Sequence, residues 1–568
     1  MSHVTESRIR FLSFPIILVA LVIVGRLYFV QVVSGSSYTE RADRQYVRPY
    51  TNLFDRGSIF FQTRDGDLIA AAGLKTGYTV SINPTRVQYP EVAYKELSKF
   101  IEIDEKEFLE KANKKKDPYE EIERRIDKEI ADKITEAKIP GVDLYKERWR
   151  YYPGDKTASH TIGFLSFKGD KLGAYYGLEN KYDDVLSRDS HEMYANFFTE
   201  ILHGINKTVL QKQSLEGDIV LTIEPTVEGY VEDQVREVRN KFSSDETGAV
   251  VIDPKTGEIV AMALAPDFDP NNTKDTSSAS VFANKLVENV YEMGSILKPI
   301  TVASGIDAGV INKDTTYNDK GFAVYDKATI YNYDKKGRGV VNMQVALNNS
   351  LNTGMAFIVE KMGKDNFTEY FKKFGISSKT NIDLPYESSP LANNLDSSRM
   401  IEHVTASFGQ GIALTPVGIA RSLSILANGG YMITPHVVKQ IKYNIGTTKD
   451  IGTEKGEQVI KPETSEEITR MLVTVVDKAL LEGKIKHDRY AIAAKTGTAQ
   501  IASPNGGYYE DRYLHSFFGY FPAYNPRFLV FMYTVNPKGV EYASHSLTEP
   551  FAKITDFLIS YYNIPPDR

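Results

Sequence analysis

Hydrophobic positions along the chain fall into three patterns that predict different kinds of structure. From Phe11 to Val33, apolar residues follow one another almost without interruption, which is long enough for a helix to cross a hydrocarbon core of about 30 Å. Between about 37 and 240, short strand-like pieces alternate with highly charged ones. After about 245, strand-like segments at both ends enclose several helical periodicities. The pattern therefore predicts a membrane helix followed by two domains of different texture.

The apolar segment 11–33 predicts one N-terminal transmembrane anchor, preceded by a short tail of residues 1–10. It is longer than the apolar part of a signal peptide, although the small residues Ser34-Gly35-Ser36 leave cleavage as the alternative. Arginines flank the segment on both sides, so charge alone does not set its orientation. No second apolar span follows, and we expect the rest of the chain to lie on one side of the membrane.

Residues 37–240 predict an α+β domain, because strand-like pieces alternate there with charged helical ones. Its most distinctive stretch is Asn83–Arg148, which is dense in lysine and glutamate. Oppositely charged residues recur there at i, i+3 and i, i+4. This spacing predicts one or two solvent-exposed helices, whose charges form a solvated face.

Residues 245–568 predict a single α/β domain whose sheet is built from both ends of the segment. A hairpin is expected at 247–263, because two strand-like runs flank the turn residues of Asp253–Gly257. Helices are expected over Met343–Met362, Phe367–Phe374, Thr415–Ala427 and Glu463–Leu481. Strands are expected over Ala491–Ala502, Ser516–Phe521 and Arg527–Val535, with a closing helix over Ser546–Tyr562.

Composition and charge remove several classes of function. The chain of 568 residues carries 68 basic and 74 acidic side chains, a formal net charge of −6, which argues against a nucleic-acid-binding protein. It has no cysteine, which excludes a disulfide scaffold, zinc–cysteine sites, iron–sulfur clusters and a cysteine nucleophile. Hydrophobic residues make up 42% and charged residues 25%, as in ordinary globular proteins.

The first candidate for chemistry is the segment Ser295-Ile296-Leu297-Lys298. If Ser295 opens a helix, the i, i+3 spacing places Ser295 and Lys298 on one face, and Gly294 permits the sharp turn into that helix. A serine hydroxyl needs a base beside it to act as a nucleophile, and a neutral lysine one turn away is such a base. Lysine has an ordinary pKa of about 10.4, so burial or nearby positive charge must lower it.

The second candidate is Ser350-Leu351-Asn352, which fits a short loop between two helices. Its hydroxyl and its amide can then face one cleft, where the hydroxyl relays a proton and the amide holds a substrate carbonyl. Taken alone, these residues fit an ordinary helix cap or turn equally well.

The third candidate is Lys495-Thr496-Gly497-Thr498, on the expected strand 491–502. On an edge strand, the lysine and the hydroxyl of Thr496 can bind a substrate carboxylate, and Gly497 lets a ligand approach the backbone closely. The N–H group of Thr498 can donate to an oxyanion. The similar tripeptide Lys255-Thr256-Gly257 lies at the expected hairpin turn, so we interpret it as turn chemistry only.

The three motifs in this order, 55 and 145 residues apart, resemble the catalytic triplet of penicillin-binding proteins and serine β-lactamases. The likeness to class B penicillin-binding proteins, which are peptidoglycan D,D-transpeptidases, extends over almost the whole chain. The segments Ser407–Gly430 and His515–Phe528 also resemble that family. The family has a penicillin-binding, β-lactamase-like α/β fold, which we therefore expect for residues 245–568.

The resemblance includes the elongated α+β pedestal, or dimerisation-like, domain of the family, which it implies for residues 37–240. Arg56-Gly57-Ser58-Ile59 resembles the start of an Arg-Gly-x-Ile-x-Asp-Arg-x-Gly motif. Here two extra residues separate Ile59 from Arg64 and Gly66, and Thr63 stands where the family has aspartate. Gly177-Leu178-Glu179 resembles another element of this domain, which in the family pairs with basic residues.

The resemblance implies an acyl-enzyme mechanism. Ser295 would attack the D-Ala-D-Ala carbonyl of a stem peptide, with Lys298 as base and Ser350 as proton relay. Asn352 would hold the donor peptide, and Lys495 with Thr496 would bind its terminal carboxylate. The N–H groups of Ser295 and Thr498 would form the oxyanion hole. A β-lactam would acylate the same serine. No metal or organic cofactor is expected.

The same resemblance implies a location and partners. The substrate lies outside the cytoplasm, so residues 1–10 would be cytoplasmic and the catalytic domain extracytoplasmic, at the cell membrane. The expected partners are peptidoglycan stem peptides, β-lactams, a membrane glycosyltransferase and proteins of cell division or elongation. The lead-in Tyr291-Glu292 favours the division type, hence a septal role.

Three other functions use similar residues. A β-lactamase or a D,D-carboxypeptidase shares the triplet, but no glutamate motif for rapid deacylation follows Ser350, and a large pedestal is superfluous for that role. A β-lactam sensor would have more membrane segments and a cytoplasmic effector domain, whereas this sequence has one apolar segment. A non-catalytic scaffold that recruits a glycosyltransferase predicts missing motif residues, whereas all are present here.

Overall fold

The computed structural model describes residues 54–168, 171–188, 215–275, 278–452 and 456–568. The chain divides into two compact units: the first is built around Thr76–Trp149, and the second comprises Arg56–Lys75, Arg150–Arg188 and Thr199–Arg568. Within the described residues, no helix combines the length and the apolarity that a bilayer crossing requires. The anchor expected at 11–33 lies outside those residues.

The first unit packs three short helices against strands. Its helices and strands are α3 (Pro90–Leu97), α4 (Glu105–Ala112), β3 (Glu120–Ile126), α5 (Lys128–Glu136), the second half of β2 (Leu68–Ile82) and most of β4 (Val142–Tyr151). Val80, Leu97, Phe108 and Ile134 contribute to a separate apolar core. This unit therefore has its own source of hydrophobic stabilisation.

The charged stretch Asn83–Arg148 differs from the prediction of one or two helices. It forms three helices, and Glu120–Ile126, whose charges look helical, is strand β3, paired with β2. Ion pairs at i, i+3 and i, i+4 do occur, as between Lys111 and Glu107 at 2.6 Å. The helical prediction for this stretch was thus wrong at β3, because pairing with a neighbouring strand overrides local preference.

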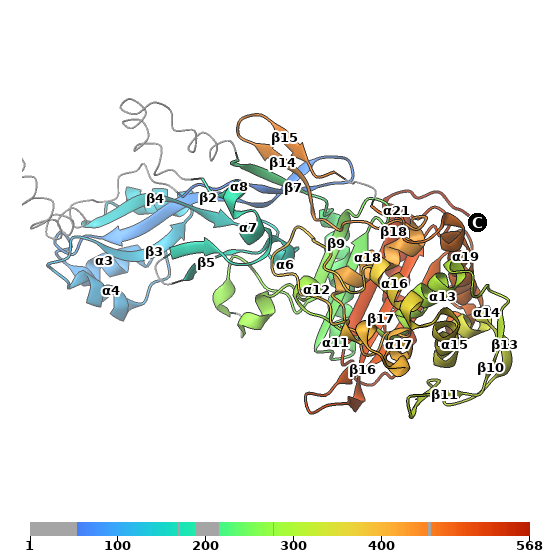
Figure 1. Ribbon diagram of the computed structural model, residues 1–568. Helices are drawn as coiled ribbons and strands as arrows, with labels where there is room; N and C mark the ends of the chain where they lie inside the picture. Colours follow the sequence, from blue (N-terminus) through green and yellow to red (C-terminus); the bar gives the residue numbers. More distant parts are fainter. Residues whose placement is uncertain (1–53, 169–170, 189–214, 276–277, 453–455) are drawn as a thin grey trace, which may run out of the picture. The chain divides into compact units, whose positions relative to one another are not determined.

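The second unit contains the five-stranded sheet that was predicted from both ends of its sequence. Its strand order is β16-β17-β18-β8-β9, with all neighbours antiparallel. In Figure 1 the green strand β9 lies in the same sheet as the orange and red strands β16–β18. The bounds are β8 (Glu246–Ile252), β9 (Ile259–Ala265), β16 (Ala493–Ala502), β17 (Tyr508–Phe521) and β18 (Phe528–Val535). Strand β16, which carries Lys495–Thr498, is an edge strand.

Alternate side chains of the sheet enter two different cores. Val250 and Phe518 belong to the core on one face, and Val251 and Phe517 belong to the core on the other. This follows from the two-residue period of a strand. Helices α11 (Pro225–Lys241) and α21 (Thr548–Tyr561) cover the second face. Both faces are covered, so β8, β9 and β18 are buried along almost their whole length.

The remaining helices form a cluster on the first face, which Figure 1 shows beside the sheet. Helix α18 is buried along its whole length, as expected for a helix that is apolar all round. The helices of this cluster are α12 (Lys285–Glu288), α13 (Lys298–Asp307), α14 (Met343–Asn348), α15 (Asn352–Met362), α16 (Lys364–Lys373), α17 (Met400–Ala406), α18 (Pro416–Ala427) and α19 (Pro462–Thr474). The candidate motifs lie where this cluster meets the sheet.

Three element boundaries differ from the prediction, and the first two affect the site. The helix expected over Met343–Met362 is broken at Ser350, which separates α14 from α15. The helix expected to open at Ser295 opens at Lys298, and Gly294–Leu297 forms a single 3-10 turn (η4) before it. The α-helix expected over Glu463–Leu481 ends at Thr474, and a π-helical turn over Val475–Ala479 and a 3-10 turn over Leu480–Gly483 follow it.

Candidate active site

Ser295 lies in the turn η4, directly before α13. Gly294 opens the turn with φ +65°, a left-handed conformation that glycine adopts without strain. The turn lies close to the edge strand, since a Cβ atom added at Gly294 would be 3.0 Å from the carbonyl oxygen of Thr498. The first and third motifs are thus neighbours in space although they are 200 residues apart in sequence.

The turn is fixed from the sheet side by strand β17. The hydroxyl of Ser516 donates to the carbonyl oxygen of Met293 over 2.7 Å. A Cβ atom at Gly497 would come within 2.6 Å of that same oxygen and 2.4 Å of Ser516 Oγ. Glycine at position 497 therefore allows the edge strand to lie directly against the turn.

The turn is fixed from the helical side by the segment after α17. The N–H of Gly294 donates to the carbonyl oxygen of Gly409 over 3.1 Å. Gly409 has φ +81°, and a Cβ atom there would lie 2.2 Å from the oxygen of Gly294. The hydroxyl of Thr301 on α13 donates to Ser407 over 2.7 Å. The close approach of the two backbones explains the glycine at position 409.

Lys298 is a buried amine held against the second motif. Only 1% of its surface is exposed. Its Nζ donates to Ser350 Oγ over 3.1 Å and also to the backbone oxygen of Ser350. Burial lowers the pKa of Lys298 well below its ordinary value, and the charge of Lys495 lowers it further. Lowering of this kind favours the neutral amine, which is the form that a base requires.

The second motif occupies the break between α14 and α15. Ser350 has φ +53°, an uncommon conformation for a residue other than glycine. Strained backbone of this kind recurs at functional sites. The side-chain N–H of Asn352, the first residue of α15, donates to the carbonyl oxygen of Tyr331 over 2.8 Å.

The third motif presents a second buried lysine. Lys495 is 4% exposed, its Nζ donates to the backbone oxygen of Thr496 over 2.9 Å, and burial lowers its pKa to about 8. Thr496 and Thr498 are half-buried. The hydroxyl of Thr498 accepts from the N–H of Ala543 over 3.2 Å. A cationic lysine with a neighbouring hydroxyl suits a carboxylate ligand.

The structure thus brings Lys298, Ser350 and Lys495 together, and it places Ser295 one turn before Lys298 on a segment that touches β16. Asn352 and Thr498 are held instead by neighbours outside the motifs, namely Tyr331 and Ala543. Sequence reasoning missed Ser516, Gly409 and the residues that hold Asn352. Ser516 and Gly409 lie in segments that the resemblance covers, but no spacing distinguishes them.

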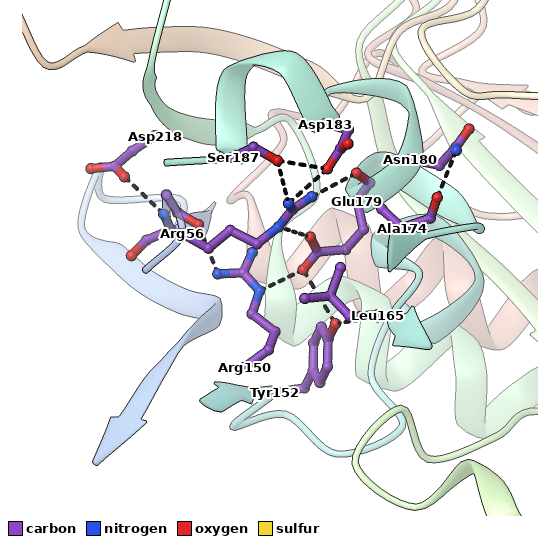
Figure 2. A network of polar contacts seen from close by, with 12 residues as sticks. Arg56, Arg150, Tyr152, Leu165, Ala174, Glu179, Asn180, Asp183, Ser187 and Asp218 are labelled. Carbon is purple, nitrogen blue, oxygen red and sulfur yellow. Dashed lines mark hydrogen bonds and ion pairs between the residues drawn. The ribbon is translucent and has the colours of Figure 1, made fainter. Parts of the chain in front are cut away.

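Outside this site, Glu179 of α7 (Gly177–Lys181) forms a buried network that Figure 2 shows from close by. The carboxylate is fully buried and accepts from Arg56 Nε over 2.6 Å and from Arg150 Nε over 2.5 Å. Tyr152 donates to it over 3.2 Å, and Arg56 also pairs with Asp183 over 2.7 Å. The pairing of Glu179 with basic residues agrees with the resemblance, whereas Arg150 as a partner was not predicted.

The turn residues Lys255-Thr256-Gly257 lie between β8 and β9, as predicted. Gly257 has φ +83°, and the N–H of Lys255 donates to the side chain of Asp253 over 2.9 Å. These are turn contacts. The tripeptide does not contribute to the site.

Comparisons with known proteins agree with this geometry. The sequence-family model of the penicillin-binding protein transpeptidase domain matches residues 247–556. That of the penicillin-binding protein dimerisation domain matches residues 54–194. Stage V sporulation protein D of Bacillus subtilis is 31% identical over 95% of this chain and 83% of its own. The peptidoglycan D,D-transpeptidase FtsI of Buchnera aphidicola is 26% identical over 96% of this chain and 93% of its own.

A solved structure shows the same fold. Penicillin-binding protein 2X of Streptococcus thermophilus superposes with a TM-score of 0.73 at 19% identity, covering 90% of this chain and 81% of that one. The chain belongs to the class B penicillin-binding proteins, in which a dimerisation domain precedes a transpeptidase domain. It is a transpeptidase of cell-wall synthesis and a β-lactam target, so the predicted family and function are confirmed.

Proposed function

We propose that this protein cross-links peptidoglycan stem peptides through an acyl-enzyme on Ser295, with Lys298 as the base. The observation that carries this proposal is the burial of the Lys298 amine. The amine contacts Ser350 and lies near the charge of Lys495, one turn after a serine. Such an amine is neutral at a pH where an exposed lysine is charged, which supports its role as a proton acceptor.

In the acylation step, Ser295 Oγ attacks the carbonyl carbon of the penultimate D-alanine while Lys298 Nζ takes the hydroxyl proton. The N–H groups of Ser295 and Thr498 stabilise the oxyanion, each contributing about 3 kcal/mol. When the C–N bond breaks, Ser350 relays the proton from Lys298 to the amine of the leaving D-alanine, which leaves Lys298 neutral again. The products are a serine ester of the donor peptide and free D-alanine.

Substrate binding uses the remaining motif residues. Lys495 and Thr496 bind the terminal carboxylate of the donor, and Gly497 leaves the strand backbone accessible. Asn352 holds the donor peptide.

In the second step, an amine of a second stem peptide attacks the ester carbonyl and gives its proton to Lys298. The new amide is the cross-link, and Ser295 is released with its proton restored.

The wider setting is also part of the proposal. Residues 11–33 anchor the chain in the cell membrane with residues 1–10 in the cytoplasm, 37–240 form the pedestal, and 245–568 form the transpeptidase domain. The apolar run of 11–33 supports the anchor. A division role is supported by the Tyr291-Glu292 lead-in. A membrane glycosyltransferase and other division proteins are the proposed partners.

The test is labelling of the full-length, detergent-solubilised protein with a fluorescent penicillin. We expect a long-lived adduct that is absent in Ser295→Ala and present in Ser304→Ala. Ser304 is the matched control, because it is a buried serine of α13 whose hydroxyl only donates within its own helix, to Ile300 over 2.8 Å. Labelling of folded Ser295→Ala would refute the nucleophile.

A second assay separates the transpeptidase from the other enzymes of its kind. A stem-peptide donor is supplied with an amine acceptor, and the products are identified by mass. Joined donor and acceptor are expected. Hydrolysis alone would indicate a carboxypeptidase, and rapid release of hydrolysed penicillin in the first assay would indicate a β-lactamase.

A further inference from the structure

A cluster of buried polar side chains lies next to the second motif, and none of its residues belongs to a motif. We call Asp319, Asn332 and Thr353 the Asp319 cluster. Asp319 and Asn332 are each 1% exposed, and Thr353 is 5% exposed. Asp319 ends β10 (Thr316–Asp319), Asn332 follows β12 (Ala328–Tyr331), and Thr353 is the second residue of α15. Three segments thus meet at one point beside Asn352.

Thr353 is held by both other members. Its hydroxyl donates to Asp319 Oδ1 over 2.8 Å, and its N–H donates to Asn332 Oδ1 over 3.2 Å. The amide N–H groups of Asn332 donate in turn to Asp319 over 2.9 Å and to Lys336. The hydroxyl of Tyr317 lies 3.1 Å from that of Thr353. The cluster is therefore well supplied with hydrogen bonds.

The carboxylate of Asp319 also closes the loop around it. It accepts from the N–H of Gly321 over 2.9 Å and from the N–H of Arg338 over 3.1 Å. A buried carboxylate is costly unless such donors surround it. Here the donors lie near both ends of the segment 319–338, at Gly321 and Arg338, and on α15, at Thr353. The carboxylate of Asp319 therefore joins that segment to the helix.

Helix α15 needs this external support. The first N–H groups of a helix have no partner within it, and the N-cap residue, Leu351, provides no side-chain acceptor. The side chain of Asn332 takes the place of the cap by accepting from Thr353. A negative charge at a helix N-terminus is additionally favourable, and Asp319 supplies it.

The contact extends to Asn352 through adjacent residues. Tyr331 accepts from the side chain of Asn352, and the next residue, Asn332, accepts from the backbone of Thr353. Two consecutive residues of one segment therefore hold two consecutive residues of the other. One interaction sets the direction of the Asn352 amide, and the other sets the position of its backbone.

We propose that Asp319, Asn332 and Thr353 are positioning residues for acylation: they hold the start of α15 so that Asn352 meets the donor peptide in a fixed orientation. This inference rests on the proposed function of Asn352. The cluster itself touches neither substrate nor reacting atoms. Its effect on the reaction passes through Asn352.

The test is a double-mutant cycle on the second-order rate constant of acylation by penicillin, measured on the full-length protein. Thr353→Val removes the hydroxyl at nearly constant volume. We expect acylation to fall about tenfold to hundredfold, the range for a small misplacement of a binding group. In the Asn352→Ala background the same substitution should change the rate less than twofold, because the group that it positions is gone.

Two controls separate positioning from stability. Thr353→Ser keeps the hydroxyl and should acylate within about threefold of the unaltered chain. Thr247→Val removes a buried hydroxyl of β8 that lies 2.7 Å from that of Thr534, so it should lower the melting temperature without slowing acylation. If Thr353→Val does not fold, Asn332→Ala replaces it in the same cycle.

The outcomes are distinct. An equal loss in both backgrounds, or no loss in folded Thr353→Val, would overturn the positioning role. Full-rate acylation of Asn352→Ala would overturn the role of Asn352 and the inference with it. Labelling of Ser295→Ala, by contrast, would refute the proposed function itself.

Discussion

Lys495 is the residue whose burial has the clearest consequence for pH. Its pKa is lowered to about 8 by burial, so the positive charge that we propose to bind the substrate carboxylate disappears as pH rises through about 8. The pKa of Lys298 is also lowered, by burial and by Lys495. As pH falls through that value, the base takes up a proton and stops accepting one from Ser295. The acylation rate constant should therefore be bell-shaped in pH, and about tenfold below its maximum one unit above the Lys495 pKa.

Lys495→Arg tests which limb belongs to which lysine. A guanidinium stays charged throughout this range, so the alkaline limb should disappear while the acid limb remains. The measurement is the rate of penicillin acylation from pH 5 to 10. An alkaline limb that keeps its midpoint in Lys495→Arg would assign it to another group.

Gly497 offers a steric prediction at the same scale. A methyl group there would meet Ser516 Oγ at 2.4 Å and Met293 O at 2.6 Å, and one of these is backbone of the Ser295 turn. We expect Gly497→Ala to shift β16 away from the turn, with a cost of about 1–3 kcal/mol in unfolding free energy. Acylation should fall roughly a hundredfold.

The matched control for this substitution is Gly229→Ala in α11. An added Cβ atom there has no heavy atom within 4 Å. Alanine should stabilise the helix by about 0.5–1 kcal/mol and leave acylation unchanged. Denaturant unfolding and penicillin labelling are measured for both variants. Acylation of Gly497→Ala at the normal rate would show that β16 can accommodate a methyl group without disturbing the Ser295 turn.

At the scale of the elements, the position of helix α7 is held by the buried carboxylate of Glu179. Glu179 is fully buried between Arg56 and Arg150. Glu179→Gln would leave the buried guanidinium group of Arg150 without its opposite charge and Arg56 with only the half-exposed carboxylate of Asp183, which costs about 3–5 kcal/mol. Asp183→Asn removes a half-exposed partner of Arg56 and should cost less than about 1 kcal/mol. Urea unfolding of both variants compares the two costs, and equal costs would contradict the role of burial.

The elements show what local pattern can predict. The β8–β9 hairpin was predictable, because Asp253–Gly257 supplies turn chemistry between two apolar runs. Strand β3 was not, because its charged residues also satisfy a helical spacing and only pairing with β2 decides. The break at Ser350 agrees with the interpretation of Ser350-Leu351-Asn352 as a loop between two helices, whereas the helical periodicity over Met343–Met362 did not reveal it.

The residues of the candidate site also fall into those that the sequence indicates and those that only the structure identifies. The roles of Ser295, Lys298 and Lys495 were proposed from motif order and residue type, and the structure adds that both lysines are buried. Asp319 and Asn332 were not, because they lie in a loop with no periodicity and become neighbours of Thr353 only in three dimensions. Residues that act by contact with a known motif need the structure to identify them.

At the scale of the molecule, each unit has its own apolar core. The core of the first unit includes Leu97 and Phe108, whereas the candidate site lies wholly in the second unit. Separate cores are the physical requirement for independent folding. The charged stretch Asn83–Arg148 can therefore be tested for a role in acylation by removing most of it.

The chain provides a convenient place for that deletion. The N–H of Asn83 donates to the carbonyl oxygen of Gly141 over 2.7 Å, so β2 and β4 are already adjacent where residues 84–140 leave and return. Joining Asn83 directly to Gly141 creates Asn-Gly, the preferred sequence of a tight hairpin turn. We expect the shortened protein to remain folded and to acylate within about twofold of the full chain, because no motif residue lies within 84–140. Circular dichroism and penicillin labelling provide the measurement. Loss of labelling in a folded protein would show instead that the removed region supports the site.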